Sequence, residues 1–325
     1  MIPTVPAVLP GQAIGLVPND ILERLEEHAR QAQGALAPET ERALRKASAA
    51  FSSWAATQGL PALPAMPETL AAYVDALTGS GRKPASIRQA VWAVATLHRA
   101  AVLPDPAKAE VVRLALKRMA RTLGTRQRQA APLGKAELIQ IFDTTGSTLS
   151  ECRDLALLRT MRDMLARRSE VVALEFADLE FAADGTATVL IRRSKTDQAG
   201  AGEVCWLARQ TAHLLRRWLD AAGISAGPIF RPVSKTGVVG STALAGGQVS
   251  RILKRLAQQA GLEPSAVSGH SVRVGMAQDL VASGNDLPAV MQAGRWKTPA
   301  MPARYAERLL AGRGAVARMQ GRGHG

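Results

Sequence analysis

The sequence is poor in cysteine and in aromatic residues, and these shortages exclude some classes of protein. Of 325 residues only Cys152 and Cys205 are cysteines, and neither lies in a CxxC motif or close to a histidine. This excludes a disulfide scaffold and argues against a structural zinc site, so both are expected to be reduced thiols of a cytoplasmic protein. Aromatic residues make up 4% of the chain. Its two tyrosines are Tyr73 and Tyr305.

Long hydrophobic runs and nucleotide-binding motifs are also missing. The longest uncharged stretches, 1–19 and 47–67, are broken by prolines, which is untypical of a signal peptide or a membrane span. There is no GxxxxGK[ST] loop of the kind that binds ATP phosphates. We therefore expect no membrane association, no metal and no cofactor.

Acidic residues are outnumbered by basic ones. The chain holds 41 Lys and Arg against 27 Asp and Glu, a formal net charge of +14, while its 47% hydrophobic content is typical of a globular protein. Residues 1–133 carry 16 basic against 10 acidic residues, and the remainder 25 against 17. An excess shared by both halves favours a polyanionic partner, first of all nucleic acid. An acidic membrane surface is the second interpretation, and charge that only confers solubility is the third.

The length and the periodicity predict two domains. Residues 1–18 are expected to form a flexible segment, 19–122 a helical domain, 123–132 a polar linker, 133–310 a larger domain and 311–325 a C-terminal tail. Proline and glycine punctuation predicts five helices in the first domain, at about 20–33, 38–59, 67–79, 84–101 and 107–122. In the second domain only 186–192 and 203–207 have convincing strand patterns. The predicted fold is mainly α with a small β-sheet.

Several basic residues are candidates for contact with nucleic acid. Arg113, Lys117 and Arg121 recur every four residues and therefore share one helix face, with Arg99 shortly before them. A solvated helix surface is the alternative, but the basic residues continue into the linker. In the second domain, Gln248 and Arg251 lie near the start of a predicted helix that follows a glycine-rich loop. There a base contact and a phosphate contact are equally compatible with the sequence.

Candidates for chemistry gather in the second domain. His270 and Arg273 are three residues apart, a spacing that suits metal-free phosphoryl chemistry, although an isolated HxxR is more often a surface pair. Arg167 and Glu170 share that spacing, for which a local ion pair is the plain interpretation. Lys195 lies in a predicted turn between two strands and is either solvated or a proton donor. Tyr305, next to Arg304, is either a surface residue or, in a cationic setting, a nucleophile.

Taken in order, these residues resemble the tyrosine recombinases, or phage-type integrases, and most closely their Cre-like branch. The match runs through "ARRSE", "SGHSVRVG" and "MQAGRW", and extends into the first domain through "ASIRQAVWAVATLHR", so it covers the chain from about residue 20. The sequence departs from the family at Leu165-Ala166, where Gly-Leu is usual, and in the length of the hairpin around Lys195. The residues matching the family's catalytic set are Arg167, Glu170, Lys195, His270, Arg273, Trp296 and Tyr305.

The resemblance implies a helical core-binding (SAM-like) domain and an α+β catalytic domain that together clamp duplex DNA. It implies that Tyr305 attacks a DNA phosphate, that Arg167 and Arg273 neutralise the phosphate oxygens, and that Lys195 protonates the leaving oxygen. His270 would move the tyrosine proton, Trp296 would donate its indole N–H to the phosphate, and Glu170 would orient its neighbours.

The resemblance also implies an assembly and a location. A protein that is a monomer when free would form a homotetramer on inverted-repeat sites, with the tail at 311–325 docking into a neighbouring subunit. It would act in the cytoplasm, associated with the nucleoid. A type IB topoisomerase or a telomere resolvase would share the chemistry, and a non-catalytic DNA-binding protein would share the fold. The complete residue set argues against the last of these.

Overall fold

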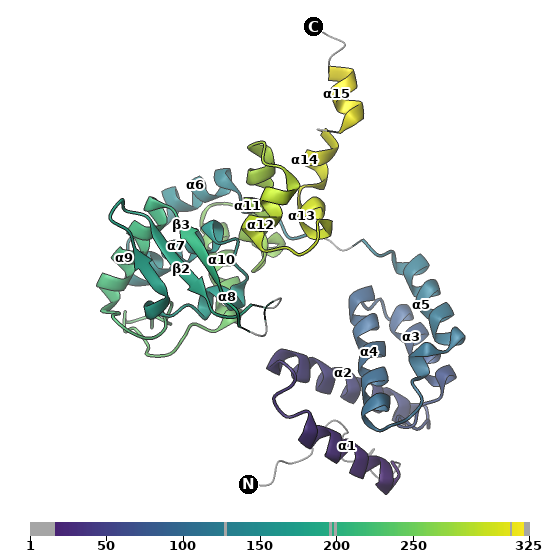
Figure 1. The fold of residues 1–325 in the computed structure, drawn as a ribbon. Helices are drawn as coiled ribbons and strands as arrows, with labels where there is room; N and C mark the ends of the chain where they lie inside the picture. Colours follow the sequence, from purple (N-terminus) through teal and green to yellow (C-terminus); the bar gives the residue numbers. More distant parts are fainter. Residues whose placement is uncertain (1–16, 127–128, 195–196, 198–199, 313, 322–325) are drawn as a thin grey trace. The chain divides into compact units, whose positions relative to one another are not determined.

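The chain consists of two units in a computed structural model that describes residues 17–126, 129–194, 197, 200–312 and 314–321. The units comprise residues 1–127 and 128–325, and each has its own hydrophobic core (Figure 1). The segment expected to be flexible, 1–18, lies outside the described residues except for Val17 and Pro18, and Val17 is buried against Ile21. The expected linker at 123–132 includes two residues, 127–128, that also lie outside them.

Within residues 17–126, the first unit forms five α-helices, as the sequence predicts. Their bounds are α1 (Asn19–Gln31), α2 (Pro38–Thr57), α3 (Pro67–Gly79), α4 (Pro84–Ala100) and α5 (Glu110–Leu123), with a short 3₁₀ turn at Pro106–Lys108. Three of them begin with proline, whose fixed φ suits the first helical position and whose missing N–H is not needed there. Their apolar stripes meet in a core around Phe51, Leu70 and Met119.

Helix α5 separates its apolar and its basic residues onto different faces. Val112, Ala115 and Met119 are fully buried. Arg113, Lys117 and Arg121, which recur every four residues along the helix, are exposed. The four-residue spacing therefore produces a basic strip on the surface of this unit, as expected.

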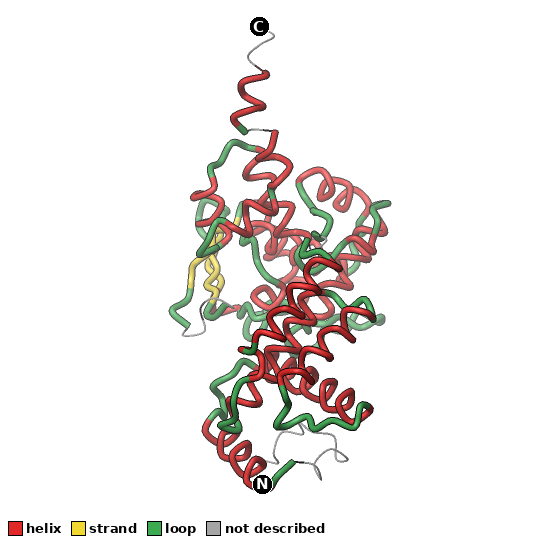
Figure 2. The backbone as a smooth tube through the Cα atoms, turned by 90° about the vertical axis from the view of Figure 1, so that its right-hand side faces the viewer, coloured by secondary structure: helices red, strands yellow, loops and turns green. Residues whose placement is uncertain are grey.

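The second unit is built around a small antiparallel sheet in the order β1 (Leu179–Phe181), β2 (Ala187–Ile191), β3 (Glu203–Leu207). Val189 in the central strand pairs with Leu179 on one side and Cys205 on the other. Helices cover one face of the sheet (Figure 2). On the outer face Val204 and Trp206 are exposed. The three-residue strand β1 was not expected, because it is too short to show an alternating pattern.

Helices joined by loops make up the rest of the described part of the second unit. Before the sheet lie α6 (Lys135–Thr144), α7 (Leu149–Asp163) and α8 (Arg168–Val172); after it come α9 (Arg209–Ala222), α10 (Gly246–Gln259), α11 (Ser271–Ala282), α12 (Leu287–Gly294), α13 (Ala300–Tyr305), α14 (Glu307–Gly312) and α15 (Ala315–Gly321). Helices α13 and α14 are separated at Ala306. There the carbonyl of Tyr305 accepts a hydrogen bond of 2.8 Å from the Gln278 side chain, so the chain changes direction after the tyrosine. In the described part of the chain, no helix has the length and apolar character that a membrane crossing requires.

A close backbone approach joins α11 to the segment that enters the second unit. The N–H of Leu133 donates to the carbonyl of Ser271 at 2.9 Å. One turn further along α11, a Cβ on Gly275 would lie 2.2 Å from the carbonyl oxygen of Leu133. Only glycine leaves room for this contact, which explains the final glycine of "SGHSVRVG".

We predict that Gly275→Ala destabilises the second unit by roughly 1–3 kcal/mol, because the added methyl group would meet backbone that cannot rotate away. The matched control is Gly246→Ala, at the start of α10, where an added Cβ meets nothing within 4 Å. Thermal denaturation checks both, and equal melting temperatures for the two variants would contradict the packing described here.

Candidate active site

Arg167 is held at the start of α8 by the glutamate three residues after it. The Arg167 N–H donates to Glu170 Oε2 at 2.9 Å, and Arg167 Nη1 donates to Glu170 Oε1 at 2.5 Å. The carboxylate therefore caps the helix and fixes the arginine side chain at the same time. The spacing that predicted a local ion pair serves to orient Arg167.

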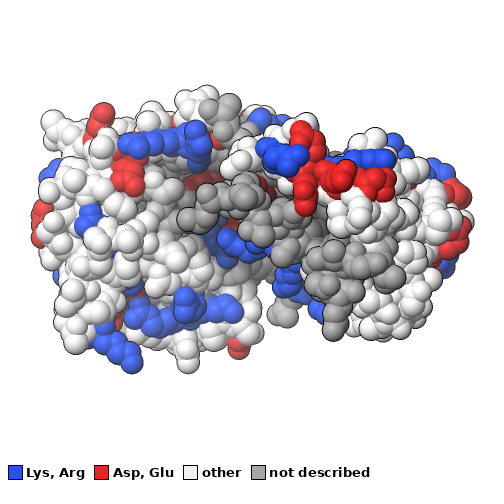
Figure 3. Space-filling model, turned by 90° about the horizontal axis from the view of Figure 1, so that it is seen from below, with Lys and Arg blue, Asp and Glu red and all other residues white. Residues whose placement is uncertain are grey.

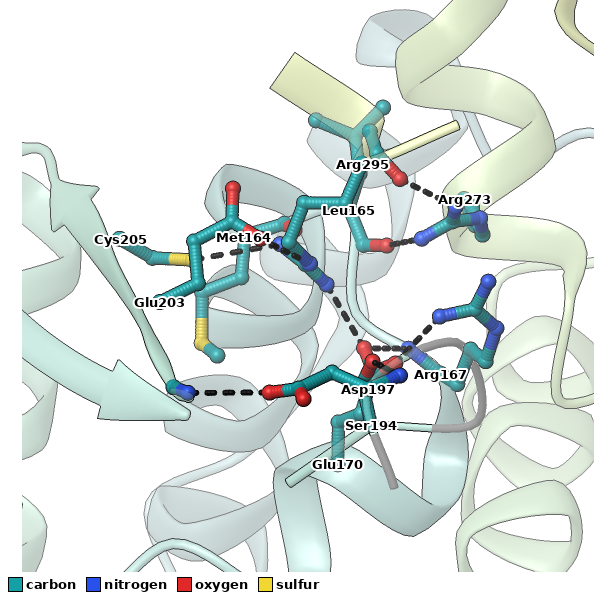
Figure 4. Close-up of polar contacts among 12 residues, drawn as sticks. Met164, Leu165, Arg167, Glu170, Ser194, Asp197, Glu203, Cys205, Arg273 and Arg295 are labelled. Carbon is teal, nitrogen blue, oxygen red and sulfur yellow. Dashed lines mark hydrogen bonds and ion pairs between the residues drawn. The ribbon is translucent and has the colours of Figure 1, made fainter. Parts of the chain in front are cut away.

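Glu170 is a buried carboxylate that stays ionised. Its side chain is 1% exposed. Burial opposes the charged form, but the Arg167 backbone N–H and the Arg295 and Arg167 guanidinium groups outweigh it and hold the pKa of Glu170 below its usual value. Arg295 approaches from the opposite side to Arg167, with Nη2 2.7 Å from Glu170 Oε2 (Figure 4).

Arg273 is the most deeply buried cation of the candidate site. It is 2% exposed and projects from α11, where Nη1 donates to the carbonyl of Leu165 and Nη2 to the carbonyl of Gly294. Burial first, and then the neighbouring charge of Arg167, lower the pKa of Arg273 to about 10. The guanidinium therefore remains charged at neutral pH.

The two carbonyls that accept hydrogen bonds from Arg273 belong to unusual stretches of backbone. Leu165 has a φ of +44°, a left-handed conformation that is uncommon for a non-glycine residue. It stands where the sequence departs from the Gly-Leu of the resembled family, so the departure places a side chain on a turn that favours glycine. At Gly294 an added Cβ would overlap the Trp296 ring, with a nearest contact of 1.8 Å.

Trp296 and Tyr305 complete the cluster around Arg273. The Arg273 guanidinium carbon lies 4.2 Å from the centre of the Trp296 ring, within range of a cation–π interaction. The Trp296 and Tyr305 rings meet edge to face at 72°, with centroids 5.9 Å apart. Tyr305 is half-buried. The Gln278 and Gln129 side chains donate to its carbonyl at 2.8 and 3.3 Å.

Five of the seven catalytic candidates are thus joined by direct contacts or through Arg273: Arg167, Glu170, Arg273, Trp296 and Tyr305. His270 is exposed at the N-cap of α11, one turn before Arg273. Lys195 lies outside the described residues.

Arg295 was not expected in the cluster, because it falls between a helix end and a tryptophan, where no spacing rule draws attention to it. In the described chain no group of three His, Cys, Asp or Glu side chains is placed to hold a metal ion.

The DNA-contact candidates are surface residues of both units. Arg99 and Arg113 are exposed but paired, Arg99 with Asp105 at 2.9 Å and Arg113 with Glu110.

On α10, Arg251 is exposed, while Gln248 Oε1 accepts a hydrogen bond of 3.0 Å from the N–H of Ala245 and so caps the helix. Figure 3 shows Lys and Arg side chains in several patches over one face of the molecule.

Comparisons with known proteins show which family the chain resembles. A model of the phage integrase family matches residues 132–310. The chain is 34% identical over 267 residues to an integrase/recombinase xerD homolog of Selenomonas ruminantium, covering 79% of this chain and 78% of that protein. It is 26% identical to the recombinase cre of Escherichia phage P1, covering 97% of each. Its fold is similar to that of a lambda integrase tetramer bound to a Holliday junction, with a TM-score of 0.57, 16% identity, and coverage of 88% of this chain and 76% of that one.

The depressed pKa of Glu170 predicts a pH dependence of stability. The pKa of Glu170 in the folded protein lies below its usual value of 4.5, so its contribution to stability is fully present above about pH 4.5 and is lost as the pH falls through the folded pKa. Glu170→Gln lacks this contribution. The difference in melting temperature between wild type and variant should therefore shrink as the pH falls below 4.5.

The control is Glu180→Gln, which alters an exposed glutamate in β1. Its melting temperature should follow that of the wild type throughout. A difference between wild type and Glu170→Gln that stays constant or widens in acid would contradict an ionised, stabilising Glu170.

Proposed function

Because the chain belongs to the phage integrase family and is a tyrosine-type site-specific recombinase, we propose that it cuts and rejoins duplex DNA through a covalent 3′-phosphotyrosine at Tyr305. One observation carries the proposal: Tyr305 packs against Trp296, whose ring lies under the Arg273 guanidinium. This places the phenol beside a cation able to stabilise charge on a phosphate. Tyr73, by contrast, is buried in the core of the first unit and packs on Phe51 and Trp54.

In the proposed step the Tyr305 oxygen attacks a backbone phosphorus. The new Oη–P bond forms as the bond from phosphorus to the 5′-oxygen breaks, and the 3′ end stays attached to the protein. His270 takes the phenol proton, and Lys195 gives a proton to the leaving 5′-oxygen. Attack by a 5′-hydroxyl on the phosphotyrosine reverses the step and reseals a strand.

Arg167 and Arg273 act on the charge that develops on the non-bridging oxygens. Their guanidinium groups supply the positive charge that metal ions supply in many phosphoryl-transfer enzymes. Trp296 donates its indole N–H to the phosphate, and Glu170 keeps Arg167 in place. The proposed reaction requires no metal ion, and no ATP because the phosphotyrosine conserves the energy of the broken bond.

The proposed partner is duplex DNA with inverted-repeat sites, contacted by both units. Support comes from the shared excess of basic residues and from the exposed strip on α5 formed by Lys117 and Arg121. Arg99, Arg113, Gln248 and Arg251 are proposed as further contacts. Such binding depends strongly on salt concentration, because each neutralised phosphate releases counterions. The proposed setting is the nucleoid in the cytoplasm.

We further propose a homotetramer on DNA, formed from monomers, in which the tail of each subunit docks into the next. On α15 Val316 and Met319 are 71% and 68% exposed and lie three residues apart, so they present one apolar face. A head-to-tail contact of this kind can close into a ring. The proposed domains are those expected from the sequence, with the tail beginning at residue 311.

Tyr305→Phe tests the nucleophile. A nicked duplex, isolated from a random-sequence pool by covalent capture with the wild-type protein, should give an adduct with the wild type and none with Tyr305→Phe. The variant should bind the same duplex with similar affinity, since only the attacking oxygen is lost. Tyr73→Phe is the matched control and should form the adduct; an adduct with Tyr305→Phe would mean that another residue attacks.

Removal of residues 311–325 tests the tail. The truncated protein should bind a single half-site with wild-type affinity, because the proposed DNA contacts remain. It should lose cooperative assembly on a full inverted repeat and slow recombination between two sites. Gel-shift titration and a recombination assay measure these effects, and unchanged recombination would rule out the proposed docking.

A further inference from the structure

Arg295 makes three hydrogen bonds from the end of α12. Nη2 donates to Glu170 Oε2 at 2.7 Å, and Nη1 donates to the carbonyl of Met164 at 2.7 Å and to the sulfur of Cys205 at 3.2 Å (Figure 4). Its side chain is 6% exposed. It therefore bridges the turn after α7, the start of α8 and the strand β3 from a single buried position.

The backbone of Arg295 is as unusual as its contacts. With a φ of +56° and ψ of 43°, it forms the left-handed C-cap of α12, a conformation that favours glycine. A bulky residue held in this region is strained. The contacts of the guanidinium offset this strain and give a physical reason for an arginine at this position.

The guanidinium of Arg295 is directed toward Glu170, the Met164 carbonyl and Cys205, whereas that of Arg273 stacks on the Trp296 ring, which contacts Tyr305. Both of its Nη atoms already have acceptors, and Nε lies 3.8 Å from Glu203 Oε2. Its influence on a bound phosphate would therefore pass through its partners. The nearest of these is Glu170, whose other oxygen holds Arg167.

The charges of the cluster give Arg295 a second effect. Without Arg295, Glu170 and Arg167 would form a neutral ion pair, and the carboxylate would weaken the electrostatic attraction between Arg167 and a phosphate. With Arg295 on the same carboxylate, the three side chains carry a net charge of +1. Glu203 offsets this only weakly, because its side chain is 52% exposed and separated from Arg295 Nε by 3.8 Å.

Arg295 also shares backbone with the clamp around Arg273. Gly294, the residue before it, gives its carbonyl to Arg273, and Leu165, the residue after Met164, does the same. The contact from Arg295 to the Met164 carbonyl thus fixes the turn whose next carbonyl receives Arg273. Both arginines proposed to bind phosphate are braced by this one side chain.

We infer that Arg295 is a positioning residue, which orients Arg167 through Glu170 and offsets the carboxylate charge so that Arg167 acts on the phosphate as a cation. The inference rests on the proposed function. It separates Arg295 from the residues that touch DNA: its loss should slow cleavage and leave affinity for DNA almost unchanged.

The test measures single-turnover adduct formation and DNA affinity with the captured nicked duplex. Arg295→Gln removes the charge and should slow cleavage by about 10²-fold, the effect expected of a small displacement in a preorganised site, with affinity within about twofold. Arg295→Lys keeps the charge but cannot reach all three acceptors, and should recover part of the rate. Arg217→Gln, an exposed arginine of α9, is the charge-matched control and should cleave at the wild-type rate.

A double-mutant cycle with Glu170→Gln distinguishes positioning from general loss of structure. If Arg295 acts mainly through Glu170, the loss of rate caused by Arg295→Gln should be about 10-fold smaller in the Glu170→Gln background than in the wild type, and the contact with the Met164 carbonyl accounts for the remainder. Equal losses in both backgrounds, or a wild-type rate for Arg295→Gln, would overturn the inference. If Arg295→Gln does not fold, the same cycle is run with Arg295→Lys. Failure of the wild type to capture any duplex would instead contradict the proposed function.

Discussion

The Arg273 guanidinium is almost completely removed from water, and the surrounding backbone and Trp296 supply the contacts that stabilise its charge. A buried charge without partners costs several kcal/mol, so acceptors must be built where the side chain ends. Leu165 adopts a left-handed conformation with its carbonyl bonded to Arg273, and Gly294 leaves room for Trp296 to cover the guanidinium face. The strained turn and the small residue are consequences of this one buried cation.

The same cluster shows how a basic protein can separate binding from chemistry. Much of the excess positive charge behind its net charge of +14 is on exposed side chains such as Lys117 and Arg121, which a phosphate backbone can reach from solvent. Arg167 and Arg273 differ because they are held by a carboxylate and by backbone carbonyls. Only charges fixed in this way can favour a transition state over a ground state.

Periodicity and punctuation predict much of the fold, because the helices of the first unit are amphipathic and three of them begin with proline. The strand β1 cannot be predicted in this way, because three residues are too few to show an alternating pattern. The break between α13 and α14 involves a hydrogen bond from Gln278, a residue distant in sequence, to the carbonyl of Tyr305. In the candidate site, the short spacing between Arg167 and Glu170 is visible in the sequence. Arg295 is not, because its contact with Glu170 spans 125 residues and its left-handed backbone follows no spacing rule.

The central claim is that Tyr305, beside the braced arginines, becomes covalently attached to DNA. The most direct measurement is mass spectrometry of the trapped adduct after digestion with nuclease and trypsin, which releases residues 305–308 as one peptide. The account predicts a nucleotide linked through its 3′-phosphate to Tyr305 in that peptide. A nucleotide on any other residue, with an unmodified 305–308 peptide, would contradict it.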